Sequence, residues 1–484
     1  MKLADLVGAD AAGPTGPGSV LNVTGFAIDH RKVAPGTIFG AFPGTRFNGE
    51  DFIATAIASG AVAVVARPGA VVEGAVHLAA DEPRQLFAQI AARFFTPVPD
   101  TVVAVTGTNG KTSTVELTRQ LWRMAGHRAA SIGTLGVTTA DESVATGMTT
   151  PDIVTFLANA SGLAREGITH LAYEASSHGL DQFRNEGLPV RAGAFTNLSR
   201  DHLDYHPSMD AYFAAKMRLF DEVVCDGGSA VVWADDAWSA RAIDHARRRR
   251  LALITVGAAG ETIRLIALTP TLLGQTLELQ HGRSTYRLTL PLIGTYQAAN
   301  ALVAAGLVLA TGGDPGRTFE ALARLQPVRG RLERAAITAA GVPVYIDYAH
   351  TPDALIAACA ALRPHVTGRL ILVFGAGGDR DAGKRGPMGA AACAGADVVI
   401  VTDDNPRGED PAAIRAEVLA GCAARACEVG DRRTAIATAI AEASAGDIVL
   451  IAGKGHEQGQ IVGRGEAMRV LPFDDVAVAR ECTA

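Results

Sequence analysis

Short apolar runs separated by polar turns recur along the whole chain, and their spacing predicts an α/β fold. Residues 61–66 and 101–106 have the length and the β-branched content of buried strands. Apolar residues at helical spacing precede the first run, over residues 51–60, and follow the second, from about residue 112 to 125. Strands that alternate with helices in this way indicate parallel sheets with helices on their faces.

The middle and the end of the chain differ in their apolar pattern. Residues 171–174 and 230–233 again resemble buried strands, whereas residues 263–292 alternate between apolar and polar positions. This alternation predicts antiparallel strands, inserted into the sheet or flanking it. Beyond residue 331, Ala-rich helical segments separate four further apolar strands, at residues 344–346, 370–374, 398–401 and 448–451. The last part of the chain therefore predicts a doubly wound sheet.

Two Pro-containing stretches divide the 484 residues into three parts. Residues 97–99 (Pro-Val-Pro) and 327–331 (Pro-Val-Arg-Gly-Arg) interrupt the strand and helix patterns and are predicted to be linkers. A chain of this length holds about three domains at roughly 150 residues each. We therefore predict domains at residues 1–97, 98–328 and 329–484.

Composition and charge exclude several classes of protein. Hydrophobic residues make up 48% of the chain and charged residues 19%, which is typical of large buried cores. The formal net charge of −6 gives no broad basic surface, so nucleic acid is not an expected partner. No apolar run approaches the roughly 18 residues of a spanning helix, and no signal peptide is apparent, so membrane insertion is not expected. The six cysteines form no C-x-x-C pair. These features favour reduced thiols in a cytoplasmic protein, which we expect to be a monomer.

Residues 107–112 (Gly-Thr-Asn-Gly-Lys-Thr) are the first candidate functional site. They follow a predicted strand and open a helix, whose N-terminus offers unpaired N–H groups and a partial positive charge. Glycines let phosphate approach the backbone, Lys111 can neutralise β and γ oxygens, and the Thr112 hydroxyl suits Mg²⁺. Val105 stands where the usual P-loop has its first glycine, so the motif is a shortened version. The alternative is an ordinary strand–helix turn, but the flanking strand and helix favour nucleotide binding.

Three polar clusters follow predicted strands in the last part of the chain, at residues 375–381, 403–407 and 453–457. Binding sites in open α/β sheets lie at the carboxyl ends of the strands. We therefore predict that these clusters are functional.

The turn at residues 107–112 also resembles the nucleotide loop of the Mur ligases, and further segments resemble that family in the same order. These segments are residues 149–151, 174–180, 197–206, 294–300, 330–333, 347–353 and 452–457, together with Lys216. One short motif can arise by chance, but a series in this order is highly specific. Within the family, residues 404–407 (Asp-Asn-Pro-Arg) resemble the signature of the members that add diaminopimelate.

The resemblance implies an architecture and an activity. The architecture is a small N-terminal α/β domain that binds the UDP part of the substrate, a central P-loop-type ATPase domain with a parallel sheet, and a C-terminal Rossmann-like domain. The activity is ATP-dependent ligation of meso-2,6-diaminopimelate to UDP-N-acetylmuramoyl-L-alanyl-D-glutamate in peptidoglycan biosynthesis. In this family ATP, with Mg²⁺, phosphorylates the substrate carboxylate, and an amine then attacks the acyl phosphate and releases phosphate.

The resemblance also implies the catalytic residues Lys111, Glu174, His202 and Lys216. The implied ATP-binding residues are Gly107, Thr108, Asn109, Gly110, Lys111, Thr112, Ser113, Asn300, Arg331 and Asp347, the last three around the adenine and ribose. Glu174 is expected to join Thr112 on one Mg²⁺, and His202 and Lys216 to serve a second. The matching lysine of the family is carbamylated by CO₂, which requires a neutral amine and therefore a lowered pKa. Taken alone, Glu174 and Lys216 would be ordinary surface residues and His202 a hydrogen-bonding histidine.

The residues implied to hold the UDP-linked substrate come from two domains. They are Ile28, His30, Thr149, Thr150, Ser176, Gln182 and Arg184. The family typically has serine where His30 stands, so the uridine contact of this chain departs from the family pattern.

The amino acid to be added carries two carboxylates and two amines. Arg380 and Arg407 can each bind a carboxylate through two hydrogen bonds, and Asp404 and Glu457 can hold ammonium groups. The resemblance adds Asn405, Pro406 and Gly453 to this set. These residues fit diaminopimelate better than lysine, which lacks the distal carboxylate. Apart from the family, residues 404–407 would be a simple turn.

Three rival functions follow from the same residues. A sister ligase would add lysine or act on folate, although residues 404–407 argue against lysine. A P-loop ATPase without ligase chemistry would release phosphate without an acceptor. A dinucleotide-dependent oxidoreductase is suggested by residues 375–378 (Gly-Ala-Gly-Gly), but these lack the G-x-G-x-x-G spacing.

Overall fold

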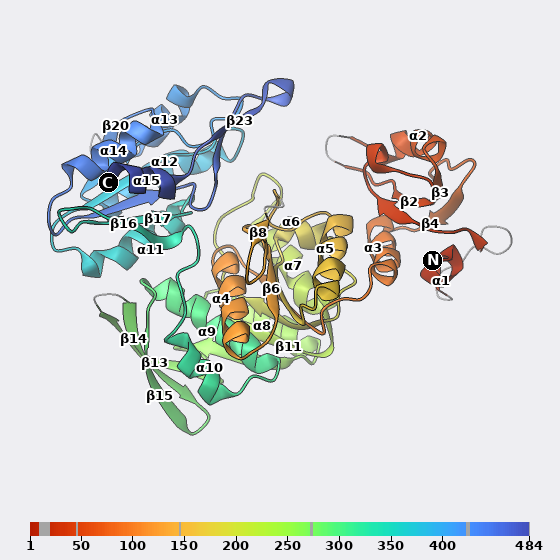
Figure 1. Ribbon diagram of the computed structural model, residues 1–484, viewed down its shortest axis with the longest axis horizontal. Helices are drawn as coiled ribbons and strands as arrows, with labels where there is room; N and C mark the ends of the chain where they lie inside the picture. The colour runs from red at the N-terminus through yellow and green to blue at the C-terminus, as the bar shows by residue number, and fades with distance from the viewer. Residues whose placement is uncertain (9–19, 45–46, 145–146, 272–273, 423–425, 484) are drawn as a thin grey trace.

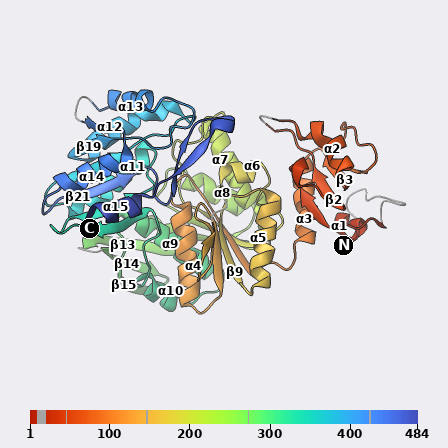
Figure 2. The same ribbon diagram turned by 45° about the horizontal axis from the view of Figure 1, so that its top comes forward.

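The computed structural model describes residues 1–8, 20–44, 47–144, 147–271, 274–422 and 426–483. Its strands form three main sheets in three lobes, which Figure 1 shows in red (N-terminal), orange to green (central) and blue (C-terminal). The central lobe lies between the other two, and Figure 2 confirms that the N-terminal lobe stands apart from the C-terminal lobe. The predicted three-domain α/β architecture is therefore confirmed.

The N-terminal lobe is a four-stranded parallel sheet in the order β1-β2-β3-β4. Its elements are α1 (Leu3–Val7), β1 (Gly25–Ala27), β2 (Thr37–Gly40), α2 (Ile53–Ala58), β3 (Ala61–Ala66), β4 (Val76–Ala79) and α3 (Pro83–Phe94). Phe87 of α3 packs edge-on against Phe26 and Phe42, with ring centroids 5.4 Å apart in both pairs. These contacts fix α3 to the sheet just before the chain crosses to the central lobe.

The central lobe contains an eleven-stranded sheet in the order β15-β14-β13-β12-β11-β10-β5-β9-β6-β7-β8. Its strands are β5 (Thr101–Thr106), β6 (Ala129–Gly133), β7 (Gly136–Thr138), β8 (Ser143–Val144), β9 (His170–Glu174), β10 (Val190–Phe195), β11 (Val224–Trp233), β12 (Ala252–Gly257), β13 (Ile263–Thr271), β14 (Gly274–His281) and β15 (Ser284–Leu290). The strands from β12 to β6 are parallel. The antiparallel strands β13 to β15 flank one edge, as the alternation over residues 263–292 predicts.

Helices cover both faces of the central sheet and bury two apolar cores. They are α4 (Lys111–Met124), α5 (Ile153–Arg165), α6 (Ser177–Asp181), α7 (Met209–Arg218), α8 (Ser239–Arg248), α9 (Thr295–Ala310) and α10 (Pro315–Leu322). The helix α9 is apolar on almost every side and packs beside α4, so it is a buried helix. Its Asn300 side chain lies next to Gly110, in the turn that opens α4.

The C-terminal lobe is a six-stranded sheet in the order β16-β17-β21-β18-β19-β20, parallel except for β16. Its strands are β16 (Arg331–Ile337), β17 (Pro343–Asp347), β18 (Leu370–Phe374), β19 (Val398–Val401), β20 (Ala426–Glu428) and β21 (Ile448–Ala452). One face packs against α11 (Pro352–Leu362), α12 (Arg385–Gly395) and α13 (Pro411–Ala420), and the other against α14 (Arg432–Glu442) and α15 (Asp475–Thr483). The predicted doubly wound sheet is confirmed. A hairpin of β22 (Gly459–Val462) and β23 (Arg469–Pro472) extends from it.

The structure corrects the predicted second linker at its last residue. Arg331 begins β16, where it is the register partner of Asp347, so the connection ends at Gly330. An antiparallel edge strand exposes one face to water and tolerates charges there, which is why the polar sequence of β16 was mistaken for a linker. The domain boundaries at 97/98 and 328/329 stay predictions.

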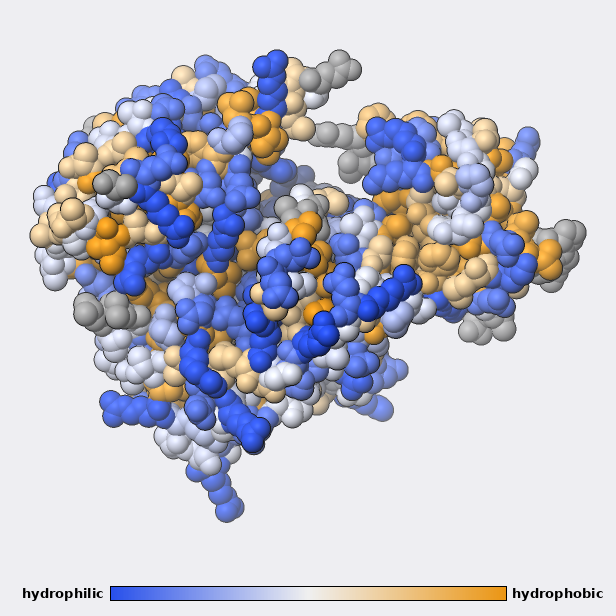
Figure 3. Space-filling view, in the orientation of Figure 1, coloured by the Kyte–Doolittle hydropathy of each residue, from blue (hydrophilic) through white to orange (hydrophobic). Residues whose placement is uncertain are grey.

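The molecular surface carries mixed polar and apolar side chains. Figure 3 shows charged residues interspersed with small apolar patches, and an open space between the N-terminal and C-terminal lobes. Within the part of the chain that the structure describes, no helix combines the length and the hydropathy needed to cross a bilayer.

Candidate active site

The phosphate turn joins β5 to α4 and depends on its glycines. Gly107 and Gly110 have φ angles of 145° and 86°, in the region that side chains disfavour. A Cβ at Gly107 would lie 2.0 Å from Thr196 Oγ1, and one at Gly110 would lie 2.3 Å from Asn300 Oδ1. The turn therefore adopts a conformation that only glycine permits at these two positions. Its N–H groups lie at the N-terminus of α4.

Residues just after β10 hold this turn in place. Thr196 Oγ1 donates to Asn109 O at 2.6 Å, and Asn109 N donates to Asn197 Oδ1 at 2.9 Å. Ser199 N donates to Thr108 Oγ1 at 3.0 Å. A loop fixed by side chains of the neighbouring strand is preorganised for a ligand rather than shaped by it.

Two lysines, the buried Lys216 and the half-buried Lys111, converge on one carbonyl of the turn. Lys111 Nζ donates to Gly107 O at 2.9 Å and to Thr108 O at 2.8 Å, and Lys216 Nζ donates to Gly107 O at 2.7 Å. Lys216 lies 4.3 Å from the centroid of the Tyr212 ring and is only 1% exposed. Burial and the neighbouring Lys111 lower the pKa of Lys216 well below its ordinary value, and burial also lowers the pKa of Lys111. A lysine in this position has an enlarged neutral fraction.

Glu174 and Thr112 provide the oxygen atoms expected to hold Mg²⁺. Glu174 ends β9 and is 2% exposed, and its carboxylate accepts from Thr134 N at 2.7 Å and from Thr134 Oγ1 at 3.1 Å. Thr112 Oγ1 accepts from Arg331 Nη2 at 3.0 Å. The structure describes no group of three or more His, Cys, Asp or Glu side chains that could hold a metal among the residues it covers. One carboxylate and one hydroxyl nevertheless fit Mg²⁺ that shares phosphate oxygens and keeps several waters.

Of the two expected donors to a second Mg²⁺, Lys216 does not fit a metal in its unmodified state. Lys216 carries an ammonium when protonated, and it has no oxygen to donate. His202 has a φ of 53°, and its Nε2 lies 3.5 Å from Asp201 Oδ2. Burial lowers the pKa of His202 to about 4, so its ring is neutral at pH 7. A second ion would require a carbamate on Lys216, which exchanges the ammonium for two oxygens.

A cavity of about 450 Å³ lies between the phosphate turn and the C-terminal lobe. Seven of the predicted ATP-binding residues line it: Asn109, Gly110, Thr112, Ser113, Asn300, Arg331 and Asp347. The Arg331 guanidinium lies over the Tyr348 ring at 4.5 Å, and its buried Nε has no hydrogen-bond partner among the described groups. Such a guanidinium is suited to an anionic ligand. Gly107, Thr108 and Lys111 do not line the cavity but form the turn behind it.

A second cavity of about 1,120 Å³ is shared by the central and C-terminal lobes. The predicted residues that line it are Thr149, Thr150, Ser176, Arg184, His202, Arg380, Asp404, Asn405, Arg407, Gly453 and Glu457. The structure thus brings the predicted substrate residues of one lobe together with the predicted amino-acid residues of the other. Glu174 and Lys216 are buried and do not line this cavity. Gln182 does not line it either, but it accepts a hydrogen bond from Arg184, which does.

The central-lobe side of this cleft is a chain of hydrogen bonds. Thr150 Oγ1 donates to Glu174 O at 2.8 Å and to Ser176 Oγ at 3.0 Å. Arg184 donates to Thr150 O at 3.2 Å and to Gln182 Oε1 at 2.6 Å. The predicted substrate residues are therefore mutually supported and connected to the strand that ends at Glu174.

The C-terminal side consists of loops that follow β18, β19 and β21. Arg407 donates to Gly378 O at 2.9 Å, and burial together with nearby Arg380 lowers the pKa of Arg407. Arg380 itself is exposed. Gly378 N donates to Asn405 O at 2.9 Å, and a Cβ at Gly378 would lie 2.0 Å from Pro406 O. The role of Pro406 is therefore to shape the loop, since it does not line the cleft.

Ile28 and His30 are not brought to either cavity. His30 lies in the N-terminal lobe, where its ring stacks on Phe52 with centroids 4.3 Å apart and planes 4° apart. Ile28 is half-buried beside the apolar core of that lobe. Their predicted contact with uracil stays a prediction.

Several residues of the site were not among those predicted. Asn197 and Ser199 fix the phosphate turn, and Lys454 is buried between the amino-acid loops. Asn197 and Lys454 both stand inside segments that resemble the family, which is the signal that could have identified them. Lys384 and Arg329 line the larger cleft and had no such signal.

A glycine-rich phosphate turn at the smaller cavity, together with arginines and carboxylates that line the larger one, supplies the parts that a nucleotide-dependent ligase needs. Three family models match the chain in order: "Mur ligase family, catalytic domain" over residues 22–95, "Mur ligase middle domain" over 105–308 and "Mur ligase, glutamate ligase domain" over 330–455. The chain belongs to the Mur ligase family, whose members use ATP and Mg²⁺.

Similar proteins cover nearly the whole chain. The UDP-N-acetylmuramoyl-L-alanyl-D-glutamate–2,6-diaminopimelate ligase of Zymomonas mobilis is 62% identical over 459 residues, which are 95% of this chain and 94% of that protein. The ligase of the same name from Bradyrhizobium diazoefficiens is 51% identical, over 98% of this chain and 97% of that protein. A solved structure of such a ligase matches with a TM-score of 0.71 at 34% identity, over 100% of this chain and 98% of that one.

Proposed function

We propose that the protein joins meso-2,6-diaminopimelate to UDP-N-acetylmuramoyl-L-alanyl-D-glutamate and converts ATP to ADP and phosphate. The observation that carries this proposal is the charge pattern of the larger cleft. Arg380 and Arg407 offer two guanidinium groups beside the carboxylates of Asp404 and Glu457. Diaminopimelate has a second carboxylate that lysine lacks, and a paired set of guanidinium groups is suited to it. The curated relatives bear the same activity in their names.

The phosphate turn supports transfer of the γ-phosphoryl group to the substrate carboxylate. Such transfer depends mainly on positioning and on neutralising charge. The N–H groups of residues 107–110 and the N-terminus of α4 offer a positive end to the phosphates. Lys111 adds its charge when its contacts with the turn carbonyls are exchanged for phosphate oxygens, and Arg331 brings a second cation from the other lobe. Thr112 and Glu174 would hold Mg²⁺, which would supply charge neutralisation at the phosphates.

The surroundings of Lys216 support its carbamylation. Carbamate formation requires a neutral amine, and the lowered pKa of Lys216 favours that state. The product is an anion, so the electrostatic repulsion between Lys216 and Lys111 would become an attraction. We propose that the carbamate, beside His202, aligns the acyl phosphate for attack.

The larger cleft supports delivery of the amine. Thr149, Thr150, Ser176, Gln182 and Arg184 form one wall and are proposed to hold the muramoyl dipeptide. On the facing wall, Arg380, Asp404, Asn405, Arg407, Gly453 and Glu457 are proposed to bind the amino acid. Because both walls belong to one cavity, the activated carboxylate and the amine meet inside it.

We further propose cytoplasmic location and action as a monomer. All six cysteines are free thiols in the structure, which suits a reducing compartment where ATP is available. A single chain contributes both walls of the cleft and the nucleotide cavity, so the proposed reaction needs no second copy.

The test is phosphate release from Mg·ATP and UDP-N-acetylmuramoyl-L-alanyl-D-glutamate with meso-diaminopimelate, with L-lysine, or with no amino acid. We expect release that depends on diaminopimelate, together with a tripeptide product by mass spectrometry. Release driven by lysine would keep the ligase but overturn the specificity. Release without an acceptor would favour a simple ATPase.

A further inference from the structure

Lys454 is a buried cation to which the proposed reaction gives no role. It follows β21, and none of its side chain is exposed. Its Nζ donates to Asn405 Oδ1 at 2.9 Å and to Glu457 Oε2 at 3.1 Å, and lies 4.0 Å from Asp404 Oδ1. Burying an ammonium is unfavourable unless its surroundings offset the lost hydration. These three oxygens provide that environment, so Lys454 is part of a built network.

The network connects the loop after β19, the loop after β21 and the strand β22 of the C-terminal lobe. Asn405 Nδ2 donates to Glu457 Oε2 at 2.7 Å, and Ile461 N donates to Asn405 Oδ1 at 2.8 Å. Asn405 Oδ1 and Glu457 Oε2 are thus each shared by two donors, and Lys454 is the donor common to both. A Cβ at Gly453 would lie 2.6 Å from Asp404 Oδ2, so these loops approach too closely for any larger residue. A buried network of this kind holds its members in one arrangement.

We infer that Lys454 is a positioning residue that sets the geometry and the charge of the amino-acid site, an inference that rests on the proposed function. It fixes Glu457 through Oε2 and thereby presents Oε1 to an ammonium group of the substrate. Its positive charge offsets one of the two carboxylates, Asp404 and Glu457. The cluster keeps one net negative charge, which matches one substrate ammonium, while Arg380 and Arg407 match the carboxylate. Lys454 does not touch the substrate, because it is sealed behind the residues it orients.

The first test is the kinetics of Lys454→Met, which removes the charge but keeps an unbranched chain. We expect the KM for diaminopimelate to rise about ten-fold or more, because a charge-assisted network is lost. The KM for ATP and kcat should stay within about two-fold. An unchanged KM for diaminopimelate, or an equal rise in the KM for ATP, would overturn the inference.

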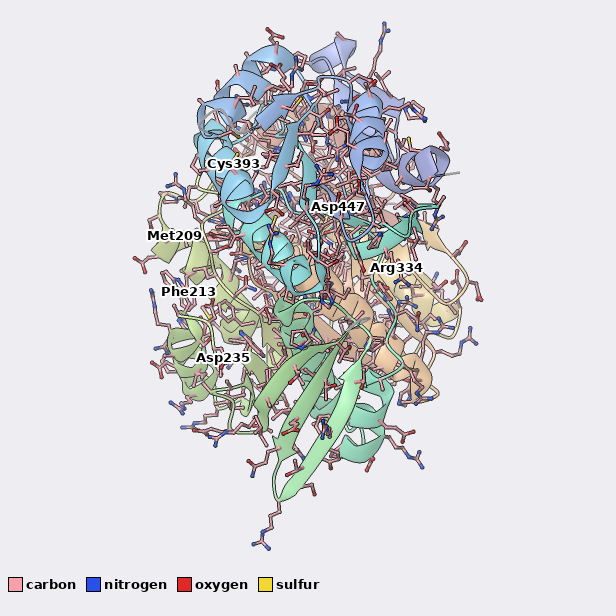
Figure 4. All side chains as sticks on the ribbon, turned by 90° about the vertical axis from the view of Figure 1, so that its left-hand side faces the viewer. Met209, Phe213, Asp235, Arg334, Cys393 and Asp447 are labelled. Carbon is pink, nitrogen blue, oxygen red and sulfur yellow. The ribbon has the colours of Figure 1, made fainter. Side chains whose placement is uncertain are left out.

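The matched control is Asp447→Asn, at the opposite end of the same strand. Asp447 precedes β21 and is 3% exposed, and it pairs with Arg369 at 2.8 Å. Figure 4 labels it in the C-terminal lobe. Its loss should lower the melting temperature without changing either KM. If both variants raise the KM for diaminopimelate equally, Lys454 has only a structural role and the inference fails.

A double-mutant cycle with Glu457→Gln tests whether Lys454 acts through Glu457. Because the two residues share one network, the double variant should raise the KM for diaminopimelate little more than the worse single variant. If the fold increases in the KM for diaminopimelate of the two single variants multiply in the double variant, the inference is contradicted. If Lys454→Met does not fold, Lys454→Gln takes its place in the experiment. It should likewise raise the KM for diaminopimelate and leave the KM for ATP unchanged. A wild-type enzyme without diaminopimelate-dependent phosphate release would instead overturn the proposed function itself.

Discussion

The two sides of the active site are built in contrasting ways. The phosphate turn is one continuous segment, residues 107–112, held by the adjacent residues 196–199 of the same lobe. The proposed amino-acid site is assembled from loops after three different strands, and Lys454 joins two of these loops. The first side depends on backbone geometry and on two lysines with lowered pKa values. The second depends on a balance of opposite charges. We infer that the turn fixes the chemistry and that the loops fix which amine is accepted.

The largest effect is expected for Lys216→Ala, on the chemical side of the comparison. If its carbamate aligns the acyl phosphate, kcat should fall by about 10²–10³-fold, as for the loss of other groups that act in the transition state. The KM values for ATP and diaminopimelate should stay within about two-fold. Steady-state phosphate release measures both.

Rescue distinguishes the carbamate from a merely structural lysine. Short carboxylic acids added to Lys216→Ala should restore part of kcat by replacing the carbamate oxygens. A variant that keeps wild-type kcat, or one that no carboxylic acid restores, would contradict the proposed role.

A smaller and different effect is expected for Arg407→Ala, on the specificity side. Loss of a charged hydrogen-bonding partner costs about 1.5–3 kcal/mol, so the KM for diaminopimelate should rise about 10–100-fold. The affinity for ATP should not change, because Arg407 lines only the larger cleft. The exposed Arg248→Ala on α8 is the matched control and should leave both KM values unaltered. If the two variants have the same KM for diaminopimelate, Arg407 does not bind this substrate.

The smallest effect is expected for Asp447→Asn, outside both regions. The hydrogen-bonded Arg369 lowers the pKa of Asp447 to about 2, so the folded state favours the ionised carboxylate. Its stabilisation is complete above the unfolded pKa of about 3.9 and is lost as the pH falls toward about 2. Since Arg369 is half-exposed, we expect a loss of only about 1 kcal/mol in the free energy of unfolding at pH 7. Denaturant titration should show the difference between variant and wild type vanishing in acid; a difference that persists would contradict the ion pair's role.

The same contrast explains what the sequence could predict. The phosphate turn was predicted because its glycines, Lys111 and Thr112 are contiguous, and the strands of the doubly wound sheet were predicted from their apolar runs and the helical segments between them. Residues 375–381, 403–407 and 453–457 were singled out because they follow strands, which meet at one edge of a parallel sheet.

What the sequence could not predict depends on packing between distant segments. Arg331, the first residue of the edge strand β16, was taken for part of a linker, because it is charged and follows a Pro-containing stretch. Arg331 contacts Thr112, 219 residues away, and nothing local signals that bond. Lys454 stands in a segment that resembles the family, but its burial and its charged partners become apparent only when the sheet order places β21 between β17 and β18. Chemical roles that a short segment carries are therefore visible in the sequence, whereas charge balance between loops requires the fold.

The central claim is that the enzyme activates a substrate carboxylate as an acyl phosphate and passes it to diaminopimelate. The most direct measurement uses UDP-N-acetylmuramoyl-L-alanyl-D-glutamate with ¹⁸O in its glutamyl carboxylates, together with Mg·ATP and diaminopimelate. We expect each phosphate released to carry one ¹⁸O atom and a tripeptide to form in equal amount. Phosphate without label would mean that water, rather than the carboxylate, receives the phosphoryl group, and would contradict the account.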